Sequence, residues 1–415
     1  METIKSFNIS KQVVWEAWKQ VKANGGAAGI DAESIAAFEV NARKNLYKLW
    51  NRMTSGSYFP PPVKAVGIPK KCGGERILGI PTVTDRIAQM IVKRYFEPLV
   101  EPYFDEDSYG YRPGKSAIQA IGVTRERCWR KDWVLEFDIK KLFDRIDHGL
   151  LMKAVKKHTN SKWIILYIER WLKAPFIKAD GTQEARNEGT PQGGVISPVL
   201  ANLFLHYVFD KWMRREYPSL QFCRYADDGI IHCKTEKQAK YVKDKLAKRF
   251  EECKLEMHPE KTRLIYCKDA DREGKYENIC FDFLGYTFRP RISKNKEGKQ
   301  FVNFTPAVSQ SALKEIRKKA RKYKMHLRSD KKLSDLSNLF GPVLRGWVNY
   351  YGHYYKSAMY PTLEHINKAL IRWAMRKYKR FRRNPKAAQH WLGELARREP
   401  RLFVHWQMGI YPTTG

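Results

Sequence analysis

The chain has 415 residues, of which 43% are hydrophobic, so it is long enough for two or three domains with packed cores. Its formal net charge of +34 favours a polyanionic partner, because a basic surface that neutralises phosphates releases their counterions. No apolar run approaches the roughly 18–20 residues that a membrane-spanning helix needs, and the polar segment 1–20 is not typical of a signal or transit peptide. The seven cysteines contain no CxxC pair, which favours a reducing, cytoplasmic compartment and argues against a structural zinc site.

The first sixty residues are predicted to be helical. Apolar positions recur at helical spacing from Val13 to Val21, and the loop Asn24-Gly25-Gly26 interrupts this pattern. The pattern resumes from Ile35 to Met53. Residues 61–300 then alternate predicted strands and helices.

A Gly-Gly turn lies between two strand-like runs within residues 68–81. It predicts a hairpin with Lys70 on one arm and Arg76 on the other. One cation on each arm is suited to gripping a triphosphate. A solvated basic turn would give the same pattern.

A predicted buried strand, residues 133–139, carries a carboxylate near its end. The sequence WVLEFDI has five apolar positions in seven, and Asp138 is the sixth residue. Burying an unpaired charge costs several kcal/mol, so Asp138 is expected to be paired, hydrogen-bonded or bound to a metal. A salt bridge to Lys140 or Lys141 is the simpler alternative.

The segment 189–198, GTPQGGVISP, runs from a tight glycine turn into Ser197-Pro198. Ser197 is predicted to be the N-cap, and Pro198 the first residue, of an apolar helix that includes residues 199–209. Such a turn lets the backbone approach a ligand closely. Gln192 at its mouth would be able to touch a nucleotide or the template base opposite it, whereas a plain loop and helix cap is the alternative.

Two adjacent carboxylates, Asp227 and Asp228, lie between the apolar runs 222–223 and 230–231, which predicts the tip of a β-hairpin. If this hairpin neighbours the strand of Asp138, three carboxylates converge. Such a set suits two Mg²⁺ ions about 3.5–4 Å apart, one activating a primer 3′-hydroxyl and the other neutralising the triphosphate and its leaving group. The implied reaction is nucleotidyl transfer, and a solvated hairpin tip is the alternative.

Residues 305–383 are predicted to be helical and contain 20 Lys or Arg against 4 Asp or Glu. A solvated helix face normally mixes charges, so the unmixed basic rows at 314–324 and 372–383 favour binding along the backbone of an A-form duplex. The candidate phosphate-binding residues are Lys318, Arg321, Lys322, Arg376, Lys377, Lys379 and Arg380. Aromatic residues lie between the rows at helical spacing, and most of them are expected to be in the core. These are Trp347, Tyr350, Tyr351, Tyr354 and Tyr355. A short helix is predicted at 388–397.

Seven blocks occur in the order found in reverse transcriptases encoded by group II introns, and the chain resembles this family from about Gly29 to Trp406. The blocks are IPKKCGGERILGIPTVTDRIAQ, SYGYRPGKSAIQA, FDIKKLFDRIDH, GTPQGGVISPVLANLFL, RYADDGIIHC, LEMHPEKTRLIY and FDFLGYTF. Residues 344–355, LRGWVNYYGHYY, resemble the maturase-specific, or thumb, segment of the same family.

The resemblance implies an α+β fold, the right-hand polymerase, with fingers, a palm that holds an antiparallel catalytic sheet, and a helical thumb. The expected domains are an N-terminal extension (1–60), fingers and palm (61–300), the thumb or maturase domain (305–383) and a C-terminal tail (384–415).

The resemblance also assigns roles to individual residues. The expected metal ligands for two Mg²⁺ ions, or Mn²⁺ in their place, are Asp138, Asp227, Asp228 and the carbonyl of Ile139. The expected dNTP-binding residues are Lys70, Arg76 and Gln192, together with Phe143 as the bulky group that excludes a ribose 2′-hydroxyl. The expected primer grip is Phe283, Leu284 and Gly285, for which an ordinary core strand is the alternative.

The implied function is synthesis of DNA from dNTPs on an RNA template with a DNA primer, in a bacterial cell. The resemblance adds binding to the protein's own intron RNA for splicing and to target DNA for mobility. The last 135 residues contain no cysteine, which argues against an HNH-type endonuclease. A stand-alone or CRISPR-associated relative stays open. So do an RNA-binding maturase without polymerase activity, which the three aspartates disfavour, and an RNA-directed RNA polymerase, which Phe143 disfavours.

Overall fold

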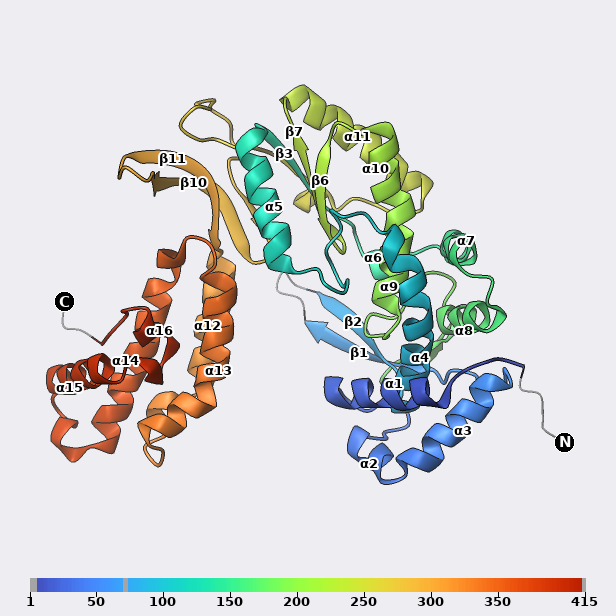
Figure 1. Cartoon of the computed structure of the whole chain (residues 1–415), viewed down its shortest axis with the longest axis horizontal. Coiled ribbons are helices and arrows are strands. Elements are labelled where there is room, and N and C mark those ends of the chain that lie inside the picture. The colour runs from blue at the N-terminus through green and yellow to red at the C-terminus, as the bar shows by residue number, and fades with distance from the viewer. Residues whose placement is uncertain (1–5, 70–73, 413–415) are drawn as a thin grey trace. The chain divides into compact units, whose positions relative to one another are not determined.

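The computed structural model describes residues 6–69 and 74–412, and the chain forms two compact units (Figure 1). The first unit comprises Met1–Ser116 and Leu135–Arg263, and the second comprises Ala117–Val134 and Leu264–Gly415. These units do not follow the linear boundaries expected at residues 60, 300 and 383, and that four-part division stays a prediction. In the described ranges, no helix has the length and apolar character needed to cross a membrane.

The first unit begins with helices that match the predicted N-terminal pattern. They are α1 (Lys11–Asn24), α2 (Ile35–Val40) and α3 (Ala42–Thr54). The Ser10 hydroxyl caps α1 by accepting a hydrogen bond from the Gln12 amide, and the helix ends at Gly25, whose φ is 67°. The second predicted helix is split at Asn41, so it is two helices rather than one. Helix α4 (Val83–Val100) packs beside α1 (Figure 1).

A four-stranded sheet in the first unit has the order β2-β1-β4-β5. Its strands are β1 (Val63–Pro69), β2 (Glu75–Ile80), β4 (Phe176–Ile177) and β5 (Gln183–Glu184). The β1 and β2 strands pair antiparallel, from Lys64 opposite Ile80 to Pro69 opposite Glu75, so the two-armed hairpin predicted within residues 68–81 is confirmed. Helices α7 (His148–His158) and α8 (Lys162–Lys173) precede β4 in the chain.

A second four-stranded sheet carries the predicted carboxylates and has the order β6-β7-β3-β8. Its strands are β3 (Trp133–Asp138), β6 (Gln221–Tyr225), β7 (Asp228–Cys233) and β8 (Arg263–Tyr266). The accompanying helices are α9 (Ser197–Leu205), a π-helical turn (His206–Asp210), α10 (Lys211–Glu216) and α11 (Glu236–Glu252). Strand β7 lies next to β3, so the condition under which the three carboxylates converge is met.

The second unit contains helix α5 (Ala117–Arg130) and a sheet of order β11-β10-β9. Its strands are β9 (Phe281–Phe283), β10 (Tyr286–Lys294) and β11 (Gln300–Val308). Leu284 and Gly285 join β9 to β10 with φ of 52° and 78°, and positive φ at both central residues is the mark of a type I′ hairpin turn. The helices that follow are α12 (Gln310–Lys322), α13 (Leu333–Tyr351), α14 (Tyr360–Lys377), α15 (Pro385–Arg398) and α16 (Val404–Gln407).

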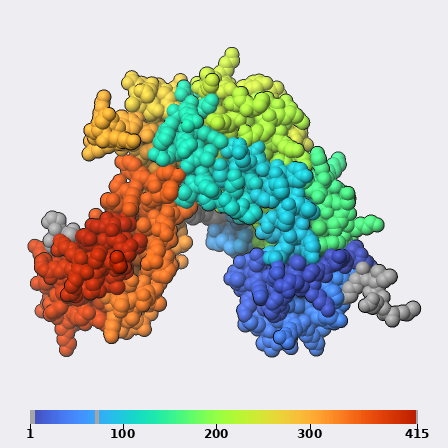
Figure 2. All heavy atoms as spheres, in the orientation of Figure 1, coloured from blue at the N-terminus to red at the C-terminus, as the bar shows by residue number. Residues whose placement is uncertain are grey.

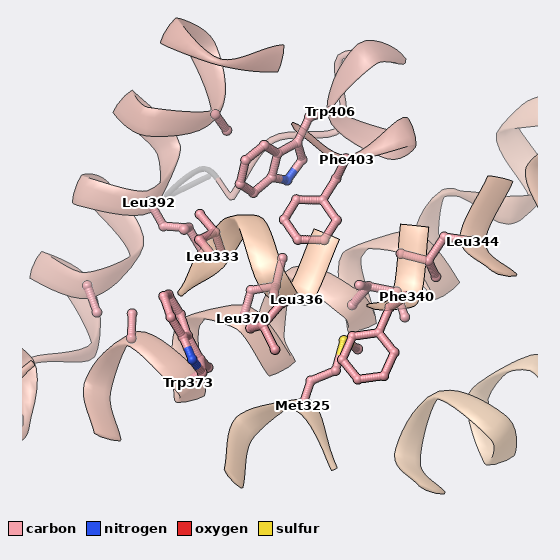
Figure 3. Close-up of a cluster of buried hydrophobic side chains, with 14 of the residues drawn as sticks. Met325, Leu333, Leu336, Phe340, Leu344, Leu370, Trp373, Leu392, Phe403 and Trp406 are labelled. Carbon is pink, nitrogen blue, oxygen red and sulfur yellow. The ribbon is translucent and has the colours of Figure 1, made fainter. Parts of the chain in front are cut away.

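These C-terminal helices share one core. In the space-filling view, residues 310–407 form a continuous mass of orange to red atoms (Figure 2). The close-up shows Leu336 and Leu370 surrounded by side chains from both the basic segment and the tail (Figure 3). Phe403 and Trp406 of the tail are 1% and 0% exposed within this cluster. The tail helix predicted at 388–397 is confirmed as part of α15, and the tail completes the core of the helical region.

Candidate active site

The tip of the β6–β7 hairpin holds two of the predicted carboxylates. Tyr225 pairs with Asp228 across the strands, so Ala226 and Asp227 form a two-residue turn, and Ala226 has a left-handed φ of 55°. Gly110 lies against this turn, because a Cβ at that position would be 2.4 Å from the Ala226 nitrogen. The predicted hairpin tip is therefore present and is packed against a second loop rather than fully solvated.

Asp138, at the end of β3, lies close to this turn. Burial raises the pKa of Asp228 well above its usual range, and the nearby charges of Asp227 and Asp138 raise it further. Burial likewise raises the pKa of Asp227, with a further contribution from Asp138. The structure thus brings together the three carboxylates that the sequence singles out.

Asp138 is paired with a lysine that the sequence prediction missed. Its Oδ2 accepts a hydrogen bond from Lys261 Nζ at 2.8 Å, whereas Lys140 Nζ instead bonds Glu256 at 2.9 and 3.0 Å. Asp138 is thus in a salt bridge, but its partner is Lys261 and not Lys140. Lys261 lies 123 residues from Asp138 in the chain. Its position within the block LEMHPEKTRLIY was the sequence signal that could have identified it as a site residue.

The chemistry of this cluster fits a divalent cation. Within the described ranges, no three His, Cys, Asp or Glu side chains are already arranged so that they could hold a metal ion. Mg²⁺ nevertheless prefers carboxylate oxygens, and the mutual repulsion that raises the pKa of Asp228 is what a bound cation would relieve. Two backbone hydrogen bonds flank Ile139: His258 N donates to the Asp138 carbonyl, and Lys140 N donates to the Glu256 carbonyl. The Ile139 carbonyl takes part in neither of them.

The residues expected to bind the nucleotide surround one loop. Phe143 lies in α6 (Leu142–Arg145), is 7% exposed, and its carbonyl accepts a hydrogen bond from Thr190 N at 2.7 Å. The Gln192 side chain accepts a hydrogen bond from Arg76 Nε and donates to Asp144 Oδ1 at 3.4 Å. Arg76, Phe143 and Gln192 therefore gather around residues 189–192, whereas Lys70 lies outside the described residues.

The same loop is tied to strand β2. Gly79 N donates to the Gln192 carbonyl at 2.8 Å, and a Cβ at Gly193 would lie 2.4 Å from the Gly79 oxygen. The predicted capping at the end of this loop is wrong in detail. Ser197 is the first residue of α9 rather than its N-cap, and its hydroxyl bonds the Thr190 hydroxyl at 2.8 Å. The predicted helix at 199–209 is also interrupted, since the π-helical turn begins at His206.

A buried hydrogen-bond network on α4 contacts the end of this loop. Gln89 Oε1 accepts hydrogen bonds from the backbone of Val195 at 2.7 Å and Ile196 at 3.3 Å, and Gln89 Nε2 donates to Asp85 at 2.9 Å. Burial raises the pKa of Asp85, which also accepts hydrogen bonds from Tyr58 and Trp171. Asp85 and Gln89 are not among the residues predicted from the sequence, although both lie in the first of the seven blocks.

The predicted primer-grip residues form the β9–β10 turn of the second unit. Phe283 is 3% exposed at the end of β9, and Leu284 and Gly285 form the turn itself. The Leu284 carbonyl accepts a hydrogen bond from Tyr350 Oη at 2.8 Å, so the turn is fastened to α13. Tyr286 packs against Tyr350, Tyr351 and Tyr354 with ring centroids 5.8, 6.0 and 5.9 Å apart. These three tyrosines are half-buried, as is Trp347, whereas Tyr355 is exposed.

Helices α12 and α14 share a cluster of positive charge, here called the α12–α14 basic face, in which Arg317 is half-buried and the other residues are exposed. Its residues are Arg317, Arg321, Lys368 and Arg372. Partial burial lowers the pKa of His365, and all four of these cations lower it further, which places them around one histidine. Of the predicted phosphate-binding residues, Arg321 belongs to this face, and Arg376 lies beside Arg372 near His326. Lys318, Lys322 and Lys379 are exposed elsewhere in this region.

Two of the predicted phosphate-binding residues are engaged within the helical region. Lys377 Nζ donates to the Ser329 carbonyl at 2.9 Å and lies over the Trp373 ring at 5.8 Å. The Arg380 guanidinium lies 4.6 Å from the centre of the Phe381 ring. Their contacts contribute to packing in addition to charge.

Comparison with known proteins gives two family matches. Residues 68–288, more than half of the chain, match the reverse transcriptase (RNA-dependent DNA polymerase) family. Residues 313–391 match the maturase-specific domain of group II introns. The chain is 31% identical over 307 residues to protein YkfC of Escherichia coli K12, which covers 65% of this chain and 77% of YkfC. It is 26% identical over 430 residues to the group II intron-encoded protein LtrA of Lactococcus lactis subsp. cremoris, covering 83% of this chain and 69% of LtrA.

Two solved telomerase structures show weaker similarity. Telomerase from Candida albicans in complex with a TWJ fragment of telomeric RNA has 13% identity and a TM-score of 0.46, covering 90% of this chain and 67% of that chain. Apo telomerase from Candida tropicalis, truncated from the C-terminal domain, has 18% identity and a TM-score of 0.44, covering 55% and 53%. Similarity this weak says nothing about function. The two family matches and the carboxylate-bearing sheet lead to one conclusion: the chain belongs to the reverse transcriptases encoded by group II introns and carries their maturase-specific domain.

Proposed function

We propose that this protein extends a DNA primer on an RNA template and that Asp138, Asp227 and Asp228 bind the two divalent ions the reaction needs. The observation that supports this proposal is the approach of the three carboxylates at the end of β3 and the β6–β7 turn. Bound Mg²⁺, or Mn²⁺ in its place, would activate the primer 3′-hydroxyl and neutralise charge on the triphosphate and its leaving group. The Ile139 carbonyl would add a backbone ligand.

The residues around the 189–192 loop would hold the incoming dNTP. Arg76 is suited to binding phosphate oxygens because its guanidinium presents several donors in one plane. Its present partner, Gln192, is a neutral amide, which a charged triphosphate would replace favourably. Gln192 would then be able to contact the nucleotide or the template base. Phe143 would close the sugar side of the pocket and exclude a 2′-hydroxyl.

The maturase-specific domain and the α12–α14 basic face support a second role. We propose that this region binds the intron RNA of the protein, which assists splicing, and that the complex then binds target DNA during retrohoming. Four cations around one histidine repel one another, and RNA phosphates would relieve that repulsion. A helix pair that only packs against the rest of the protein would not need four cations around one histidine.

Primer extension by an Asp227→Asn variant tests the polymerase proposal. We expect extension on an RNA template to fall about 100-fold or more, because the metal ions contribute several kcal/mol to transition-state stabilisation. RNA affinity, measured by filter binding, should stay close to wild type, since the basic helices bind phosphate. Asp244→Asn, an exposed change on α11, is the matched control. Extension by Asp227→Asn near the wild-type rate would refute the metal assignment, and a wild type that binds RNA without extending primers would favour a maturase without polymerase activity.

A further inference from the structure

A fully buried ion pair joins the β6–β7 hairpin to the π-helical turn before α10. Arg224, in β6, and Asp210, at the end of the π-helical turn, are both 0% exposed. Arg224 Nε donates to Asp210 Oδ1 at 2.8 Å and Nη2 donates to Oδ2 at 2.6 Å, so the pair is bidentate. A buried ion pair is weak evidence for stability, because desolvating two charges offsets their attraction. The geometry of this ion pair therefore suggests a role other than stabilising the fold.

The third nitrogen of the guanidinium reaches the turn that carries the carboxylates. Arg224 Nη1 donates to the Ala226 carbonyl at 3.1 Å and to Asn202 Oδ1 at 3.2 Å. Asn202 Nδ2 in turn donates to the Gly110 carbonyl at 2.7 Å. Gly110 is the residue that lies against the backbone of Ala226. One connected network thus holds the turn and the loop against it.

The backbone of Arg224 adds to this connection. Arg224 N donates to the Asp107 carbonyl at 2.9 Å, and Tyr109 N donates to the Arg224 carbonyl at 2.8 Å. Ser108 accordingly forms a parallel bridge with Arg224, which places the segment before Gly110 alongside β6. The turn is therefore fixed through the side chain and the main chain of the same residue.

The turn needs such a restraint. Ala226 is held at a φ of 55°, where a residue with a side chain is disfavoured. Ala226 directly precedes Asp227, so a rotation of its peptide would turn both neighbouring carboxylates. π-helical turns are rare, and the one at 206–210 places the Asp210 carboxylate against Arg224.

We propose that Arg224, oriented by Asp210 and Asn202, is a positioning residue that fixes the Ala226 carbonyl and so aims the carboxylates of Asp227 and Asp228. This inference rests on the proposed function, in which those carboxylates bind the divalent ions. The Arg224 side chain is fully buried and bonds Asp210, Asn202 and the Ala226 carbonyl, so it is a positioning residue and not a ligand. Its loss is expected to act on turnover through the geometry of the turn.

The test compares Arg224→Met with the double variant Arg224→Met/Asp210→Leu in the full-length chain. Removing Arg224 alone leaves a buried carboxylate unpaired and should lower the melting temperature sharply. The double variant replaces both charges by apolar groups of similar size, so its melting temperature should return most of the way to wild type. Its kcat should still be about 10- to 100-fold below wild type, as for a catalytic group misplaced by about 1 Å, while KM for dNTP changes little.

Arg272→Met is the matched control. Arg272 also hydrogen-bonds a carboxylate, that of Asp269, and two backbone carbonyls, those of Cys128 and Lys131, and it lies 3.6 Å from Asp132, but it belongs to the second unit. This variant should lose stability while its kcat stays at the wild-type value. A double variant with restored stability and wild-type kcat would overturn the inference.

Amide hydrogen exchange at residues 225–229 gives a readout that does not depend on activity. Arg224→Lys keeps the charge against Asp210 but lacks the fork that reaches Ala226, so it is the variant for this measurement and the substitute if the double variant does not fold. We expect these amides to exchange faster than in wild type, with protection elsewhere unchanged. Unchanged exchange at the turn would overturn the inference. A wild type that extends no primer would overturn the proposed function alone, because the exchange result would still decide whether Arg224 fixes the turn.

Discussion

Phe143 is the residue proposed to select the sugar of the incoming nucleotide. It follows Asp138 by five residues, lies at 7% exposure in the short helix α6, and its carbonyl anchors Thr190 of the Gln192 loop. The backbone around it is therefore fixed independently of its ring. If Phe143 lies in the nucleotide pocket, as proposed, its ring would discriminate by collision with a 2′-hydroxyl rather than by a lost hydrogen bond.

Phe143→Ala should admit ribonucleotides and retain much of the activity with deoxynucleotides. We expect the ratio of rNTP to dNTP incorporation to rise about tenfold or more, in line with about 1–3 kcal/mol for a steric term in a pocket. Single-nucleotide incorporation measures this ratio, with Phe143→Tyr as the control that keeps the ring. If Phe143 is only a core residue, truncation would instead cost about 3–5 kcal/mol of stability and lower both activities together. An unchanged ratio at an unchanged melting temperature would remove Phe143 from the pocket.

At the scale of elements, the α12–α14 basic face is the clearest candidate for RNA binding, because it combines charges from two helices that are distant in sequence. Lys377 and Arg380 differ from it, since each also contacts an aromatic ring of the same region. A change at those two positions would mix a loss of charge with a loss of packing. Substitutions in the α12–α14 basic face are therefore better suited to measuring the effect of lost charge on RNA binding.

Replacing the four residues of the α12–α14 basic face by alanine together should weaken RNA binding and flatten its dependence on salt. Each lost phosphate contact lowers the slope of log affinity against log salt by roughly 0.7–0.9. The control removes the same charge from α11, where lysines are interspersed with acidic residues, through alanine at Lys237, Lys240, Lys245 and Lys248. Affinity measured from low to high salt decides the matter. A slope equal to that of wild type would mean that the face does not bind phosphates.

Elements with a strong local pattern were predictable from the sequence, and polar partners were not. Apolar runs and glycine turns predict β3, the β1–β2 hairpin and the β6–β7 turn, and the structure confirms all three. Lys261, Arg224, Asp85 and Gln89 were missed, because their partners are set by tertiary packing, as for Asp138 and Lys261 at a separation of 123 residues. The roles of Phe143 and the primer grip came from the family resemblance alone, whereas those of the carboxylates, Arg76 and Gln192 came from the residues and the resemblance together; all of them stay predictions.

For the whole molecule, two buried histidines link stability to pH, one in each unit. Burial lowers the pKa of His405 to about 3, and burial followed by Lys211 and Arg224 lowers that of His206 to about 4. The unfolded chain binds protons at these positions below about pH 6.5, whereas the folded chain does not. Their contribution to stability is therefore complete above about pH 6.5 and is lost as the pH falls. The buried carboxyl groups with raised pKa, such as Asp85, act in the opposite direction.

A His405→Gln variant isolates one of these contributions, since glutamine retains a donor for Asn367, the partner of His405. Between about pH 6.5 and pH 5, the wild type should lose about 1.4 kcal/mol per pH unit more than the variant in free energy of unfolding. Chemical denaturation at several pH values measures the difference, and His390→Gln, at an exposed position on α15, is the control. A difference between wild type and His405→Gln that does not change with pH would contradict the assignment of His405 as a buried neutral histidine.

The bond between Gly79 and Gln192 has a consequence for movement. Strand β2 carries Arg76, and the loop carries Gln192, yet the two are joined by a main-chain hydrogen bond of 2.8 Å and by the close contact of Gly193 with the Gly79 oxygen. The β1–β2 hairpin and the loop are therefore expected to move together rather than separately. If Arg76 binds the phosphates and Gln192 contacts the base, as proposed above, both contacts would form in the same step.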